Sequence, residues 1–247
     1  FLSGNTFDLN IGYREINLTG ATRQATVING GLPGPVLRWH QGDNVKLSVT
    51  NQLAVDSSIH WHGILLPPEM DGVPDLSFDG IAPGTTFDYR FKVMQSGTYW
   101  YHSHSGFQEQ TGMYGAIVID PLEPAPYSFD REYVLLLSDW SDEKPEDIYA
   151  TLKKQSHYYN RNMRTVGDLF QQIGEQGAAS TWNDRRMWNR MRMNDRDVSD
   201  VTGATYTFLV NGNTPDQNWT GLFNKGERVL LRVVNAAAMT LFDLRIP

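Results

Sequence analysis

Four of the six histidines in this 247-residue chain lie in two His-x-His pairs, His60 with His62 and His102 with His104. In a β-strand, residues i and i+2 point to the same face, so each pair would present two imidazoles to one side. Both flanks favour strands, because residues 55–66 are rich in Ile, Leu and Trp and residues 98–101 read Thr-Tyr-Trp-Tyr. We therefore expect the two pairs on two strands of one sheet or barrel.

Two imidazole pairs of this kind indicate a metal site. Neutral imidazoles suit copper or zinc, whereas calcium and magnesium prefer a cage of oxygen atoms that the pattern does not supply. The chain contains no cysteine, which excludes disulfides, cysteine-based zinc sites and a thiolate ligand for copper within these residues.

The composition narrows the class of protein. A length of 247 residues allows two domains, and a hydrophobic content of 40% fits a globular protein. The formal net charge of −7 argues against a nucleic acid or an anionic membrane surface as partner. No apolar run approaches the ~20 residues that a membrane-spanning helix needs.

The first half of the chain has the pattern of an all-β protein. Short apolar runs alternate with Gly and Pro turns, which predicts strands at residues 7–11, 45–49, 86–91 and 115–120. The proline-rich residues 121–126 predict a stiff linker, so we expect one domain at residues 1–122 and a second at residues 128–247.

The second half mixes strand and helix signals. Strands are predicted at residues 132–140, 205–210, 228–234 and from 241 onward, with an insertion of helices and loops at about 145–200. Within the insertion, residues 145–154 begin with Pro and two acids and end with two lysines, which favours a helix. The few strands and the last one, cut short at Pro247, predict an incomplete second domain.

Four motifs carry a resemblance to a known family. They are His60-Trp61-His62-Gly63-Ile64, Met70-Asp71-Gly72-Val73-Pro74, Ile81-Ala82-Pro83-Gly84 and Gly97-Thr98-Tyr99-Trp100-Tyr101-His102-Ser103-His104. In order, spacing and flanks they resemble the first domain of the multicopper oxidases, which include laccases, ascorbate oxidase and ferroxidases. Leu136-Leu137-Ser138-Asp139-Trp140 and Asn211-Gly212-Asn213-Thr214-Pro215 are similar to the second domain of the bacterial copper-resistance branch.

The resemblance implies a fold and a metal centre. The fold would consist of cupredoxin-like Greek-key β-barrel domains, and eight histidines from the first and last domains would hold a trinuclear copper cluster. His60 would bind the type 2 copper, His62 and His102 one type 3 copper, and His104 the other. The family's last domain, with the cysteine-centred type 1 copper, has no counterpart here, so the implied partner is a C-terminal remainder of the same protein.

The resemblance also implies an activity, in a periplasmic or secreted setting. A laccase-like oxidase takes single electrons from phenols or Cu(I) and reduces O2 to water. Two other functions stay open on the sequence: a copper-binding or copper-storage protein without oxidase activity, and an inactive interaction domain that retains the motifs.

Two acids near the histidine motifs are further candidates. Asp71 fits an ordinary Asp-Gly turn, but it matches the family position of an acid beside the cluster, where a carboxylate can relay protons to reacting oxygen. We therefore name Asp71 as the catalytic candidate. Glu109, five residues after His104, would lie near the rim of the site or simply face solvent.

Three methionines in the insertion allow two interpretations. Met187 and Met191 would share a helix face, and Met193 follows closely. Thioether sulfur is a soft ligand suited to Cu(I), whereas the simpler interpretation is that these side chains are adaptable packing material.

Overall fold

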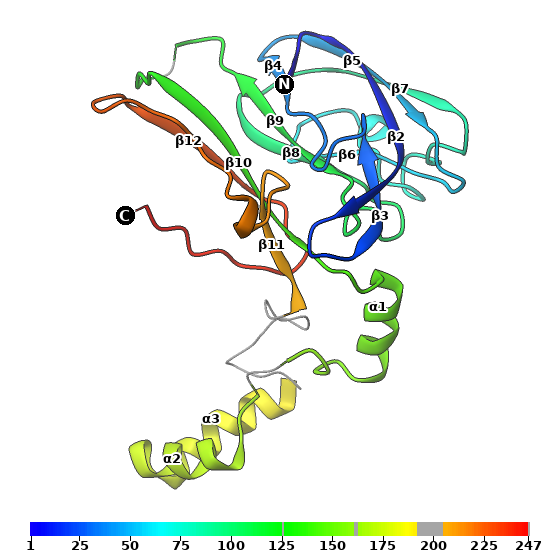
Figure 1. The fold of residues 1–247 in the computed structure, drawn as a ribbon. Coiled ribbons are helices and arrows are strands. Elements are labelled where there is room, and N and C mark those ends of the chain that lie inside the picture. The colour runs from blue at the N-terminus through cyan, green and yellow to red at the C-terminus, as the bar shows by residue number, and fades with distance from the viewer. Residues whose placement is uncertain (125, 161–162, 192–204, 247) are drawn as a thin grey trace. The chain divides into compact units, whose positions relative to one another are not determined.

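The computed structural model describes residues 1–124, 126–160, 163–191 and 205–246. Its contacts divide the chain into two compact units, residues 1–145 with 207–247 and residues 146–206 (Figure 1). The residue bounds of the second unit are similar to those of the predicted insertion, about 145–200. The domain boundary predicted between residues 122 and 128 stays a prediction. No helix in the described part of the chain is long and apolar enough to cross a membrane.

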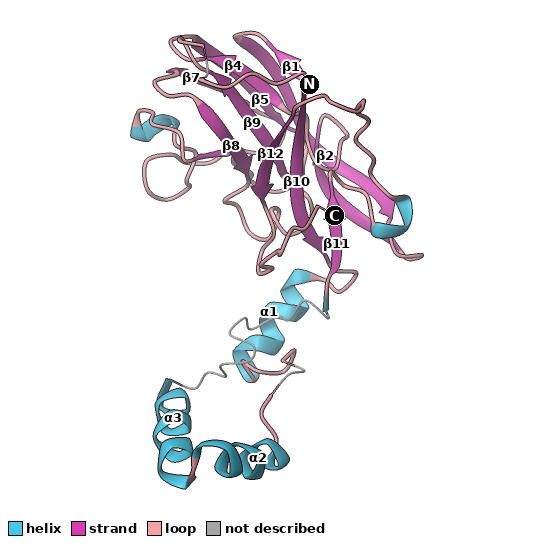
Figure 2. Cartoon of the chain, turned by 90° about the vertical axis from the view of Figure 1, so that its left-hand side faces the viewer, coloured by secondary structure: helices cyan, strands magenta, loops and turns pink. Residues whose placement is uncertain are grey.

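The first unit contains two sheets built from the first nine strands (Figure 2). One has the order β3-β2-β5-β7, from Thr22–Ile28, Thr6–Asn17, Asn44–Asn51 and Thr86–Lys92. The other has the order β1-β4-β9-β8-β6, from Leu2–Ser3, Leu37–His40, Tyr114–Asp120, Gly97–His102 and His60–His62. The four strands predicted in this half correspond to β2, β5, β7 and β9.

One hydrophobic core lies between these two sheets. Along β2, Phe7, Leu9 and Ile11 are buried while the residues between them are exposed, as expected for a strand with one face in a core. The same cluster contains Trp39 from β4 and Trp61 from β6. The alternation of apolar and polar residues along β2 therefore matches the face of the strand that is buried.

β9 is covered on both faces. Ile117 and Ile119 face the core between the two sheets, whereas Tyr114, Ala116 and Val118 belong to a second cluster. That cluster is completed by a third sheet of order β11-β10-β12, formed by Thr207–Val210, Arg131–Trp140 and Val229–Asn235. The third sheet contains three of the four strands predicted in the second half of the chain.

The described residues confirm a mostly β fold, but the expected closed barrel is corrected. The described strands form three separate sheets of five, four and three strands. In the first two sheets the edge strands are β1, β6, β3 and β7, and among the described residues no backbone ladder joins an edge of one sheet to an edge of the other. The core is therefore that of a sandwich, whose two layers meet through side chains rather than through hydrogen bonds.

The described residues of the insertion form three helices, α1 at Pro145–Lys154, α2 at Val166–Gln176 and α3 at Ala178–Met191. α1 begins with Pro145, Glu146 and Asp147 and ends with two lysines, as predicted from the helix dipole. α2 starts at a capping box in which Thr165 and Asp168 satisfy each other's backbone N–H groups.

The strand predicted from residue 241 onward does not form within the described residues. Residues 241–246 have no regular secondary structure, and Leu241 and Ile246 are 90% and 80% exposed. Phe242 packs against Phe208 of β11, with ring centroids 5.6 Å apart. The sequence has strand propensity here, but no described strand offers this segment a backbone ladder.

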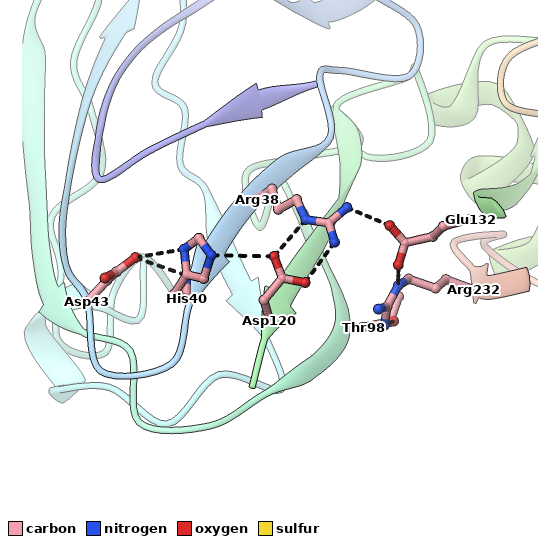
Figure 3. A network of polar contacts seen from close by, with 7 residues as sticks. All are labelled: Arg38, His40, Asp43, Thr98, Asp120, Glu132 and Arg232. Atoms are coloured by element: carbon pink, nitrogen blue, oxygen red, sulfur yellow. Dashed lines mark hydrogen bonds and ion pairs between the residues drawn. The ribbon is translucent and has the colours of Figure 1, made fainter. Parts of the chain in front are cut away.

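A chain of charged side chains connects the five-stranded sheet to the third sheet (Figure 3). Arg38 of β4 donates two hydrogen bonds of 2.7 Å to Asp120 of β9. The same guanidinium also contacts Glu132 of β10, which accepts a 2.6 Å hydrogen bond from Arg232 of β12. Glu132 is 11% exposed and Arg232 is 13% exposed. Because both charges are largely removed from water, each one is stabilised by the opposite charge of the other.

We predict that the Arg38–Asp120 pair makes stability fall at acidic pH. Hydrogen bonds from Arg38 hold the pKa of Asp120 below its usual range, so this carboxylate stabilises the fold above its unfolded pKa. That contribution is lost as pH falls from about 4 through the lower folded pKa. Urea unfolding at pH 6 and pH 3 should therefore show a smaller pH-dependent loss in Asp120→Asn than in the parent.

At pH 6, Asp120→Asn should lower the free energy of unfolding by about 1.5–3 kcal/mol, the usual contribution of a hydrogen bond to a charged group. Asp79→Asn, at an exposed position, serves as the control and should follow the parent. A parent and an Asp120→Asn variant with identical pH dependence would contradict the assignment.

Candidate metal centre

The two histidine pairs meet on adjacent antiparallel strands. In the pairing of β6 with β8, His60 lies opposite His102 and His62 lies opposite Trp100. Trp61, between the first two histidines, points the other way into the core and is fully buried. The prediction of two strands of one sheet is therefore confirmed for His60, His62 and His102, whereas His104 lies beyond the end of β8.

Three of the four rings form a compact group of nitrogen atoms. One ring nitrogen from each of His60, His62 and His102 lies within 4.8 Å of the others. The closest approach is 3.2 Å, between Nδ1 of His62 and Nε2 of His102. Trp100 stacks on His102, with ring centroids 4.1 Å apart, and thus limits the movement of that ring.

His104 reaches the group from outside the strand. β8 ends at His102, so the i, i+2 rule does not place the second pair. His104 is instead held by a hydrogen bond of 3.1 Å from its backbone N–H to Oγ of Ser58. Its ring centroid lies 4.9 Å from that of His60 and 5.1 Å from that of His102, which leaves it at the edge of the same group.

Backbone and carboxylate acceptors assign the tautomers of two rings. Nδ1 of His60 lies 2.9 Å from the carbonyl oxygen of Asp71. Nδ1 of His102 lies 3.1 Å from the carbonyl oxygen of Ser103 and 2.5 Å from the carboxylate of Glu109. These oxygens accept, so both Nδ1 atoms carry the hydrogen and the lone pair of each neutral ring lies on Nε2, which in His102 faces Nδ1 of His62.

The electrostatics favour neutral rings at His62 and His104. Partial burial, followed by the neighbouring His102 and His60, holds the pKa of both His62 and His104 below the usual value. Glu109 acts in the opposite direction on both, with a smaller effect. Neutral imidazoles are the form that binds metal, so protons compete weakly for these two ligands near pH 7.

A glutamine that no sequence pattern indicated connects the two segments that carry the histidines. The amide oxygen of Gln108 accepts hydrogen bonds from Ser57 and Ser103, at 2.7 and 2.9 Å. Its amide nitrogen donates to the carbonyl oxygen of Asp56 at 2.9 Å. The segment before β6 and the loop after β8 are thereby held together, and the only sequence signal is proximity to His104.

Asp71 lies beside His60, as the resemblance implied. It follows a single 3-10 turn, η1 at Pro68–Met70, and its carboxylate Oδ1 is 3.4 Å from Nδ1 of His60. The carboxylate side chain is 33% exposed, so it touches both the histidine and solvent. The turn and the site are therefore compatible roles for the same residue.

Gly72 brings Asp71 to the site. Its φ is +74°, and a Cβ at this position would lie 1.9 Å from the carbonyl oxygen of Ile59, the residue before His60. Only glycine allows this backbone to pass so close to β6. The loop and the first histidine pair are thus in direct backbone contact.

We predict that Gly72→Ala destabilises the protein and displaces Asp71. The left-handed backbone alone costs about 1–3 kcal/mol with a side chain, and the clash with Ile59 adds to it. Gly84→Ala is a matched control, because Gly84 has φ +72° with no atom within 4 Å of its Cβ position. Chemical unfolding should show a clearly larger loss for Gly72→Ala than for Gly84→Ala, and equal losses would contradict the close approach.

The remaining candidates are His40 in the first unit, three residues in the second unit, and one residue outside the described part of the chain. His40 contacts Asp43 and Asp120, and His157 is exposed. Met187 and Met191 of α3 are 52% and 47% exposed, so neither is core packing within the described residues. Met193 lies outside the described residues, and a role for the methionines in binding Cu(I) stays a prediction.

The donor set fits copper. Imidazole nitrogens suit copper and zinc, and two of the rings are already oriented through Nδ1 so that Nε2 can bind. The described residues contribute no thiolate, because the chain has no cysteine. The group is therefore suited to a centre held by nitrogen ligands.

Comparisons with known proteins agree with this chemistry. Residues 10–124 match the family model described as multicopper oxidase. Over the whole chain, the sequence is 58% identical to copper resistance protein A of Pseudomonas syringae pv. tomato, of which it covers 40%. It is 32% identical, over 94% of the chain, to multicopper oxidase MmcO of Mycobacterium tuberculosis, of which it covers 42%.

Solved structures resemble the fold as well. A multicopper oxidase from Pseudomonas thermotolerans matches 97% of this chain with a TM-score of 0.67 and 28% sequence identity. The match covers 48% of that protein. The chain likewise spans about two fifths of the length of the curated relatives named above.

Proposed function

The chain belongs to the multicopper oxidase family, and we propose that it supplies half of the ligands for a trinuclear copper cluster in a laccase-like oxidase. The oxidase would take single electrons from phenols or Cu(I) and reduce O2 to water. The observation that carries the proposal is the group of ring nitrogens within 4.8 Å at one end of β6 and β8. A periplasmic or secreted location, which the family resemblance implied, is part of the proposal.

Each histidine has a proposed place. His60 binds the type 2 copper, His62 and His102 bind one type 3 copper, and His104 binds the other. The short distance between His62 and His102 supports their assignment to one ion, and the position of His104 outside the strand supports a separate ion. Bound copper supplies one-electron chemistry, so that four substrate electrons and four protons convert O2 into two waters.

The other residues of the site hold these ligands in position. The carbonyl oxygen of Asp71 orients His60, and Trp100 covers one face of His102. Ser58 fixes the backbone of His104. Ligands held in this way lose little freedom when they bind metal, which favours affinity.

We propose that the Asp71 carboxyl group delivers protons to reacting oxygen. It is partly exposed and lies 3.4 Å from His60, so it can exchange protons with solvent on one side and act on the site on the other. Its backbone carbonyl, not its carboxylate, makes the shorter contact to His60. Replacing the carboxyl group with an amide therefore leaves the orientation of His60 intact.

Asp71→Asn should slow oxygen reduction by about 10²–10⁴-fold, the usual contribution of a positioned proton donor. Copper content and reduction of the type 1 copper should stay near the parent values in the full-length protein. Rapid-mixing measurements of O2 reduction would test this, with the exposed Asp79→Asn as control. Equal rates of O2 reduction in the parent and Asp71→Asn across pH would show that Asp71 serves only as a turn residue.

The remainder of the polypeptide is the proposed partner. It would contribute four further histidines and the cysteine-ligated type 1 copper, which the absence of cysteine makes impossible in this chain. Exposed apolar side chains on the third sheet and after it support a covering segment, since Phe208, Val233 and Leu244 are 40%, 45% and 52% exposed.

A copper-binding or storage function without oxidase activity is the second candidate. It is favoured by the same absence of cysteine, because the described ligands bind metal but offer no entry point for electrons. O2 uptake by the copper-loaded full-length protein, with a phenol or Cu(I) as electron donor, separates the two. Sustained uptake supports the oxidase, and copper binding without uptake supports storage.

A further inference from the structure

Among the described carboxylates, Glu109 makes the shortest contact with the histidine group. Its Oε2 lies 2.5 Å from Nδ1 of His102, a ring that is 6% exposed. Glu109 itself is 30% exposed, so it is neither fully buried nor a free surface glutamate. The expectation that it simply faces solvent does not describe this side chain.

The loop between β8 and β9 fixes the direction of this carboxylate. The N–H of Gly112 donates to the carbonyl oxygen of Glu109 at 3.0 Å, and the N–H of Met113 donates to that of Gln108 at 3.0 Å. The Gln108 side chain is tied to Ser57, Ser103 and the Asp56 backbone. The backbone at Glu109 is therefore held against both segments that carry the histidines.

We propose that Glu109 is the positioning residue of His102. Its carboxylate accepts the Nδ1 hydrogen, which fixes the tautomer and the rotation of the ring and leaves Nε2 available as the ligand. The carbonyl oxygen of Ser103, at 3.1 Å, is the weaker of the two acceptors at Nδ1. This inference rests on the proposed function, because it concerns how His102 is presented to copper.

Two conservative replacements separate the effect of the Glu109 charge from the effect of the position of its acceptor oxygen. Glu109→Gln keeps the length of the side chain and an oxygen that accepts a hydrogen bond, but removes the charge. Glu109→Asp keeps the charge but is one methylene shorter, so its carboxylate falls short of Nδ1. Glu109→Ala removes both, and Glu123→Ala removes a glutamate at an exposed position away from the site.

The test is the copper affinity of the full-length protein, measured by titrating the metal-free form with copper against a competing chelator. Loss of an outer residue that orients a metal ligand costs about 10–100-fold in metal affinity. We expect that loss in Glu109→Asp and Glu109→Ala at the site that uses His102, together with a weakened type 3 absorption. Glu109→Gln should recover most of the parent affinity, and Glu123→Ala should equal the parent.

If Glu109→Asp kept the copper affinity of the parent and Glu109→Gln lost affinity, the proposal would be overturned in favour of a role for charge alone. Parent affinity in all three Glu109 variants would also overturn it. A parent protein that binds no copper through these histidines would instead refute the proposed function. Thermal unfolding of the metal-free variants separates loss of fold from loss of ligand orientation, and the Gln and Asp forms both preserve a polar side chain at this position.

Discussion

Replacing His102 with alanine is expected to abolish type 3 copper and oxidase activity in the full-length protein. His102 lies at the centre of the group, opposite His60 in the strand register and 3.2 Å from His62. The loss should exceed the about 10–100-fold effect of removing a supporting residue, because a ligand itself is removed. His62→Ala should have the same result if both rings bind one ion.

Copper content, type 3 absorption and O2 uptake are the measurements. His157→Ala is the control, because His157 is exposed and lies in the second unit. Unchanged copper content in both His62→Ala and His102→Ala would contradict the assignment. Equal loss in the control would point to a general effect on folding or copper loading.

Trp61→Ala is expected to destabilise the fold more than either Gly72→Ala or Asp120→Asn. The Trp61 side chain is fully buried, and its ring lies 5.2 Å from that of Tyr89 and 6.0 Å from those of Trp39 and Tyr101. Removing such a ring from a packed core costs about 3–5 kcal/mol. Because Trp61 lies between His60 and His62, copper affinity should fall together with stability.

Two matched variants sharpen this prediction. Nε1 of Trp61 is buried, and no described acceptor lies within hydrogen-bond distance. Trp61→Phe keeps much of the apolar contact and removes an unpaired donor. Its loss of stability should therefore be much smaller than that of Trp61→Ala. Trp182→Ala, at a 70% exposed position, should change the free energy of unfolding by about 0.5 kcal/mol or less, as measured by chemical denaturation.

Local patterns in the sequence predicted those parts of the fold that depend on local periodicity. Short apolar runs between Gly and Pro turns predicted β2, β5, β7 and β9, and the strand predicted at residues 132–140 is β10. The register of β6 and β8 then explains why His60 and His62 converge with His102. For these three histidines, two paired strands and a side-chain period of two are sufficient.

Other features depend on contacts between distant residues, which a local pattern does not encode. The apolar run at 55–66 forms a strand only at His60–His62, because pairing with β8 ends there. His104 falls outside its strand and is held by Ser58. The contact of Glu109 with His102 is likewise fixed by the loop, through hydrogen bonds to residues about fifty positions earlier.

The different burial of the strands gives the metal centre two anchors of unequal mobility. β9 is covered on both faces and pairs with β8 along the whole length of β8, so we expect its amide hydrogens to exchange only when the whole unit unfolds. β6 is three residues long, lies at the edge of the sheet and pairs with β8 alone among the described strands. Its amides can exchange through local opening, and each opening would move His60 and His62 away from His102. A metal ion bound across the two strands would close that opening, so the edge strand is where bound copper would slow amide exchange most.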